Sequence, residues 1–143
     1  MADGRDEAPV DYDRLQPIAK RVINAVAGGG LSSLSVQDQT FYLLWCYGAL
    51  LDNGGHASYF YNSGADYFAE TVDALNRVGL HAFGGLLGDS ANVFFSGDVP
   101  REMLSRNAVM REGDASMIDH AFFEADGGDA VLRALDRWYP ANG

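Results

Sequence analysis

Apolar residues recur along the chain at the three- and four-residue spacing that places side chains on one face of a helix. Two such stripes are Leu15, Ile18, Val22 and Val26 near the N-terminus, and Val131, Leu132, Leu135 and Trp138 near the C-terminus. No segment shows the two-residue alternation of a half-buried β-strand, and no internal repeat is visible. The pattern therefore predicts an all-α fold.

Glycine, serine and proline mark where the expected helices begin and end. The first helix should end at residues 28–30, and Pro17 should fall in its first turn, where proline is tolerated. Ser35 or Ser33 can cap the second helix, and Asp38 stands three residues after Ser35, as in a capping box. The remaining expected helices cover residues 36–51, 65–78, 80–95, 100–111, 116–124 and 129–139. We thus expect about seven or eight short helices in one compact domain of residues 10–143, after a flexible tail of residues 1–9.

The stretch from Asp52 to Phe68 looks like a binding loop, because it contains a histidine, two asparagines and several aromatic residues. The helix before it, residues 36–51, is apolar nearly all round, which is typical of a central, buried helix. Asn-Gly-Gly at residues 53–55 can close that helix, and Ser63 can cap a following one. We interpret the stretch as a corner at which the chain folds back, with its aromatic residues in the core.

Charge is the most informative property of the composition. The chain has 20 acidic and 10 basic residues, a formal net charge of −10. Arg77 is the only Lys or Arg between residues 22 and 100, and residues 112–129 contain six acidic residues and no Lys or Arg. This distribution excludes binding to nucleic acid or to an anionic membrane through a basic patch. A basic partner is the electrostatically complementary one.

Asp66, Glu70 and Asp73 stand at positions i, i+4 and i+7 of an expected helix and would form one acidic stripe. The stripe would span about 10 Å. Its charges would be more widely spaced than the phosphates of one DNA strand, about 3.4 Å apart, so two acidic faces side by side would be needed to imitate a duplex. The candidate partner-binding residues are Asp66, Glu70, Asp73, Asp119, Glu124 and Asp126. The alternative, an ordinary solubilising coat of negative charge, stays open.

No catalytic arrangement can be assembled from the sequence. His56, His81 and His120 lack a second His or Cys at the spacing of a zinc-ligand pair. The glycine-rich residues 84–88 lack the Lys-Ser/Thr end of a phosphate-binding loop. Asp-Gly-Gly-Asp at residues 126–129 lacks the alternating oxygen ligands of a calcium loop. We therefore expect a non-enzymatic protein without a metal or a cofactor.

Three further features favour a cytoplasmic protein. No apolar run reaches the roughly 18 residues of a membrane span. The N-terminal residues 1–13 lack the apolar centre of a secretory signal. Cys46 is the single cysteine, so no intramolecular disulfide can form, and its apolar neighbours are typical of a buried thiol rather than a nucleophile.

The corner also carries a resemblance to a known family. The residues concerned are Asn53, Gly54, Gly55, Tyr59, Phe60, Tyr61, Asn62, Ser63, Gly64, Ala74, Leu75 and Gly79. They are similar to the Asn-Gly-Gly, Tyr-Phe-x-Asn and Ser-Gly signature of a bacterial all-helical family whose best-known member is a DNA-mimic protein. The resemblance implies a helical fold, homodimerisation as an option, no known enzyme activity, and a DNA-binding regulator as the precedent for a partner. The signature contains no surface carboxylates, so it assigns no role to any acidic residue.

Two functions of different classes remain as hypotheses. The first is a non-enzymatic protein that offers acidic helix faces to a basic partner, such as a DNA-binding regulator. The second is a small-ligand or peptide-binding module whose pocket lies at the corner of residues 53–62, lined by His56, Tyr59, Tyr61 and Asn62. A helical domain whose charge serves only solubility is the third reading.

Overall fold

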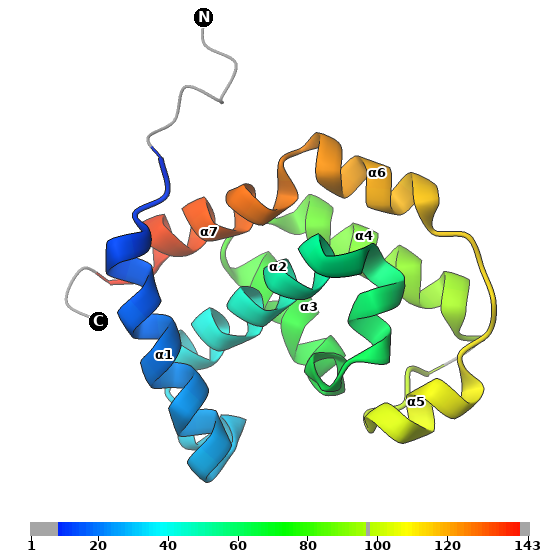
Figure 1. The fold of residues 1–143 in the computed structure, drawn as a ribbon, viewed down its shortest axis with the longest axis horizontal. Helices are drawn as coiled ribbons and strands as arrows, with labels where there is room; N and C mark the ends of the chain where they lie inside the picture. The colour runs from blue at the N-terminus through cyan, green and yellow to red at the C-terminus, as the bar shows by residue number, and fades with distance from the viewer. Residues whose placement is uncertain (1–8, 97, 141–143) are drawn as a thin grey trace, which may run out of the picture.

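A computed structural model describes residues 9–96 and 98–140. This part of the chain is all-α, as predicted, and contains no strand (Figure 1). Its elements are α1 (Tyr12–Gly29), η1 (Leu31–Ser33), α2 (Val36–Tyr61), η2 (Ser63–Tyr67), α3 (Phe68–Arg77), α4 (His81–Phe94), α5 (Met103–Val109), α6 (Ser116–Glu124) and α7 (Gly127–Trp138), where η denotes a 3-10 helix. Except for Pro9, the expected tail of residues 1–9 lies outside the described residues. None of the described helices is long and apolar enough to cross a membrane.

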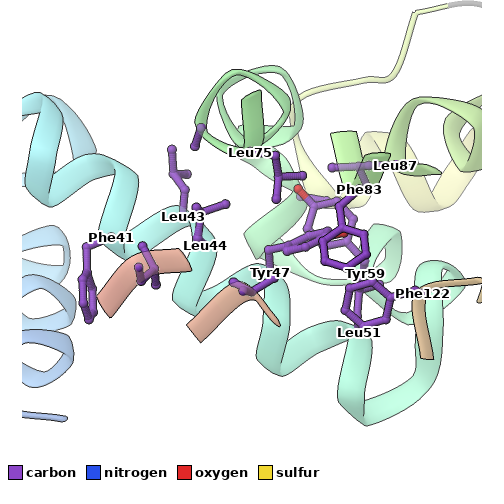
Figure 2. Packing of buried hydrophobic residues seen from close by; sticks show 14 of the residues in the cluster. Phe41, Leu43, Leu44, Tyr47, Leu51, Tyr59, Leu75, Phe83, Leu87 and Phe122 are labelled. Carbon is purple, nitrogen blue, oxygen red and sulfur yellow. The ribbon is translucent and has the colours of Figure 1, made fainter. Parts of the chain in front are cut away.

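Helix α2 forms the centre of the domain and contacts each of the other six α-helices (Figure 1). Its side chains Phe41, Leu44, Tyr47 and Leu51 are completely buried. Figure 2 shows residues of α3, α4 and α6 reaching the same cluster from the other side, with Phe122 of α6 among them. Each such large apolar side chain contributes about 1.5–3 kcal/mol through burial. The apolar character of α2 on all sides therefore follows from its central position.

The corner is a kink within α2. Gly54 and Gly55 leave the helical conformation, and Gly55 has a φ of 76°. A Cβ atom on Gly55 would lie 2.7 Å from a carboxylate oxygen of Asp119, so both the backbone and the packing require glycine there. Tyr59 and Phe60 follow the kink and are buried. The predicted change of direction is confirmed at residues 54–55, as is the burial of Tyr59 and Phe60. The expected helix end there is wrong, because α2 resumes after the kink and continues to Tyr61, which is 55% exposed.

Two sequence signals at helix starts gave opposite outcomes. Ser35 accepts a hydrogen bond from the backbone N–H of Asp38 at 3.2 Å, which confirms the predicted cap of α2. The expectation for Pro17 is wrong, because α1 begins at Tyr12 and Pro17 lies in its interior. Pro17 leaves the carbonyl of Asp13 without its intrahelical donor, and both residues are exposed, so water can satisfy that carbonyl.

Two other predicted helix starts are also wrong. Ser63 begins the 3-10 helix η2 rather than capping an α-helix, and Pro100 precedes α5 instead of lying in its first turn. Both segments are tied to the guanidinium of Arg106, which is completely buried. It donates to the backbone carbonyls of Phe60, Asn62, Pro100 and Arg101 and to the carboxylate of Asp66. Four backbone carbonyls and one carboxylate from two segments thus converge on one buried side chain, and this tertiary contact overrides the local signals.

Candidate functional site

The expected acidic stripe on α3 is largely paired within the molecule. Arg106 binds the carboxylate of Asp66 at 2.9 Å, and Arg101 binds Glu70 at 2.9 Å. Asp66 lies in η2, before α3 begins. Asp73 lies on α3 and is exposed. The chain segment around α5 thus supplies the cations that the sequence around the stripe lacks.

Asp119 has a structural role at the corner. One of its carboxylate oxygens accepts the backbone N–H of His56 at 2.9 Å and lies 2.6 Å from Nδ1 of the same residue. His56 is completely buried, and burial lowers the pKa of its ring while the hydrogen bond to Asp119 raises it. The carboxylate therefore anchors α6 to the kink of α2.

Two acidic residues of the C-terminal stretch, Asp126 and Asp129, line a hollow between α2 and the turn from α6 to α7. The hollow has a volume of about 220 Å³. Its lining consists of Asp52, Phe123, Asp126, Gly127, Gly128 and Asp129. Glu124 lies nearby at the end of α6, with Oε1 3.6 Å from His120 Nε2, and both side chains are mostly exposed. We call Asp52, Glu124, Asp126 and Asp129 the α6–α7 acidic edge.

Packing explains the backbone of this edge. Asp126 has a φ of 51°, a left-handed conformation that Asp and Asn adopt more readily than most residues. A Cβ atom on Gly127 would lie 2.4 Å from the ring of Phe122, and one on Gly128 would lie 2.5 Å from the carboxylate of Asp52. The two glycines therefore allow α7 to begin directly against α2. Among the described residues, no group of three or more His, Cys, Asp or Glu is placed to hold a metal ion.

Asp129 and Asp52 belong to this edge but were not among the expected partner-binding residues, and Asp52 comes from a distant part of the sequence. Partial burial raises the pKa of its carboxyl group, and the negative charge of Asp129 raises it further. The guanidinium of Arg133 lies near Asp129, with Nη2 of Arg133 3.9 Å from Oδ2 of Asp129. Asp52 joins the edge through a contact between α2 and α7, which are far apart in the sequence. The available signal was the helical spacing of Trp45, Ala49 and Asp52 on one face of α2.

Asp52 also lines a second hollow, of about 210 Å³, between α1, α2 and α7. Here its neighbours are mostly apolar and include Trp45 and Leu132. A third hollow, of about 390 Å³, lies between Leu31 and Tyr67 and has Glu70 on its lining. Of the expected partner-binding residues, Asp126 lines the first hollow and Glu124 is exposed at the end of α6, whereas Asp66, Glu70 and Asp119 contact other parts of the chain.

The residues expected to line a pocket at the corner differ in their burial. His56 and Tyr59 are buried in the core, with exposures of 0% and 1%, whereas Tyr61 is 55% exposed. The side-chain amide of Asn62 donates to the carbonyl of Ser58 at 2.8 Å. Their arrangement corresponds to a packed corner that stabilises the fold.

Comparison with protein families gives one match. A family model described as DMP19-like protein matches residues 32–142. The match covers α2 to α7, including the corner and the α6–α7 acidic edge, and begins after α1. No curated protein and no solved structure shows significant similarity to the chain.

Proposed function

The chain belongs to the DMP19-like family, a DNA-mimic-like family, and on that premise we propose that it is a non-enzymatic protein that binds a basic partner through the α6–α7 acidic edge. The observation that carries this proposal is the grouping of Asp52, Asp126 and Asp129 around one hollow, in a stretch whose residues 112–129 include no Lys or Arg. Exposed carboxylates attract a basic surface and steer its approach.

The partner that suits this edge is a DNA-binding protein. Its basic surface is built to meet closely spaced negative charges. A homodimer, which the family resemblance gives as an option, would carry two copies of the edge in one particle. Competition between the protein and DNA for the same regulator is the expected biological effect in the cytoplasm.

The test is capture of a DNA-binding protein at low salt, followed by competition with DNA. The captured protein should be released as salt rises, because exposed charges are screened over about 10 Å at 0.1 M. The double variant Glu124→Gln with Asp126→Asn should weaken binding by roughly tenfold, since each exposed pair is worth up to about 1 kcal/mol. Asn also tolerates the left-handed conformation at residue 126.

The matched control is Asp73→Asn, which removes one exposed carboxylate from α3. It should leave the affinity nearly unchanged. If each removed carboxylate lowers the affinity equally in the double variant and in Asp73→Asn, the negative surface acts as a whole. If the double variant keeps its affinity for the partner, the proposed edge is refuted. Sedimentation of the free protein and of the complex tests the dimer separately.

A further inference from the structure

The second hollow is lined mostly by apolar residues and contains one acidic residue, Asp52, so the overall negative charge of the protein does not account for it. One stripe of α2 forms its wall: Trp45, Gly48, Ala49 and Asp52 stand at i, i+3, i+4 and i+7. Leu132 of α7 and Tyr12 of α1 complete the apolar part of the lining. The stripe is therefore aromatic at one end, small in the middle and negatively charged at the other end.

The small residues in the middle keep the hollow open. Gly48 is a poorer helix former than alanine would be. A Cβ atom there would meet its nearest neighbour, Val131, at 3.8 Å, an ordinary van der Waals contact. Core packing thus tolerates alanine at this position. Ala49, next to it, is exposed and also lines the hollow.

The size and chemistry of the hollow fit one long cationic side chain. Its volume of about 210 Å³ is below the roughly 300 Å³ at which small-molecule pockets begin. Arg and Lys side chains lay their aliphatic stems on apolar surfaces and keep their charged heads at the rim. Asp52 lines both hollows, so a head group that reaches it also approaches Asp126 and Asp129.

We propose that the hollow between Trp45 and Asp52 binds an arginine side chain of the basic protein partner. Arginine fits better than lysine because its planar guanidinium can stack on an aromatic ring and bind a carboxylate with two hydrogen bonds. This inference rests on the proposed function and adds to it a specific anchor. The α6–α7 acidic edge attracts the partner over a long range, and the hollow then binds one of its arginine side chains.

The test uses the fluorescence of Trp45 in a Trp138→Phe variant, in which Trp45 is the single tryptophan. The probe is the peptide acetyl-Gly-Arg-Gly-amide, with citrulline and lysine versions as comparisons. The arginine peptide should change the fluorescence with saturation at a roughly millimolar dissociation constant, as expected of one side chain. The lysine peptide should bind more weakly and the citrulline peptide, which lacks the charge, should not saturate.

Three variants separate the hollow from the charge around it. Ala49→Leu fills the hollow without changing the charge, and leucine is a good helix former, so at least tenfold weaker binding is expected. Asp52→Asn should have a similar effect, and Asp73→Asn, which removes the same charge on α3, should have none. If Trp138→Phe unfolds the chain, amide chemical shifts of the unmodified protein near residues 48, 52 and 128 provide the same readout.

The inference is overturned if Ala49→Leu binds the arginine peptide like the unmodified protein, or if Asp52→Asn and Asp73→Asn weaken it equally. Agmatine that binds tenfold more tightly than the peptide would also overturn it, because the hollow would then take a free guanidine. Partner binding that survives Ala49→Leu but is lost in Glu124→Gln with Asp126→Asn would remove the arginine site and leave the proposed function standing. Saturable binding of the arginine peptide, with no basic protein partner recovered, would refute the proposed function and with it the assignment of the hollow to an arginine of that partner.

Discussion

Two acidic regions of this protein look alike in the sequence and differ in the structure. The region around α3 carries Asp66 and Glu70, and each is paired with an arginine from residues 101–106. The α6–α7 acidic edge carries Asp52, Asp126 and Asp129 around an open hollow. The cation near this edge is Arg133, whose guanidinium lies 3.9 Å from the carboxylate of Asp129, farther than the 2.9 Å of the two pairs near α3. An acidic run in a sequence therefore presents its charge only where the fold does not pair it closely with arginines.

The same arginines explain why the first region stabilises the fold rather than presenting charge. A guanidinium that is fully enclosed must satisfy its donors inside the protein. Arg106 does so with the carbonyls of Phe60 and Asn62, at the C-terminal end of α2, and with Asp66. Arg101 makes an exposed pair with Glu70, with 61% and 37% of the side chains accessible. These two pairs provide the sharpest contrast between a buried and an exposed interaction in the molecule.

The largest effect is expected for Arg106→Ala. It leaves several buried carbonyls without donors and Asp66 without its partner, which costs about 3–5 kcal/mol in the free energy of unfolding. Arg101→Ala should cost less than about 1 kcal/mol, as exposed pairs do. Urea denaturation of both variants checks the difference, and similar losses in the two would contradict the distinction between a buried anchor and a surface pair.

Gly55→Ala should have the next largest effect, about 1–3 kcal/mol, because alanine is strained at the positive φ of this residue. Its methyl group would also displace the carboxylate of Asp119 from His56. The matched control is Gly85→Ala on the exposed face of α4, where a Cβ atom meets nothing within 4 Å. That change should stabilise the protein by roughly 0.5–1 kcal/mol. The melting temperature should therefore fall in Gly55→Ala and rise in Gly85→Ala. An equal fall in both would contradict a special requirement for glycine at residue 55.

A smaller effect is expected when the pH is lowered. Burial lowers the pKa of His56 below its ordinary value of 6.5, so the folded protein binds fewer protons there than the unfolded chain does. The stability present above pH 6.5 should therefore decline as the pH falls from 7.5 to 5. His56→Gln should flatten that decline, whereas His120→Gln, on the exposed face of α6, should leave it unchanged. If His120→Gln abolishes the decline in stability instead, His56 is not its source and the prediction is contradicted.

The start of α2 and the corner within it were predictable because their signals are local. Ser35 caps the start of α2 through a hydrogen bond to a residue three positions later, and the glycine at residue 55 is required by its own backbone conformation. The pairing of Arg106 with Asp66 was not, because it joins residues 40 positions apart. The same limit applies to the candidate site. Glu124 and Asp126 belong to a visible acidic run, whereas Asp52 reaches that run through the contact of its carboxylate with Gly128.

The central claim, that accessible negative charge is concentrated on the α6–α7 acidic edge, has one direct measurement. A tetralysine peptide is titrated into labelled protein at low salt, and the amide chemical shifts are followed residue by residue. Residues 124–129 and Asp52 should respond at lower peptide concentrations than residues 66–73, because Asp66 and Glu70 already bind arginines. An equal or stronger response along residues 66–73 would contradict the account.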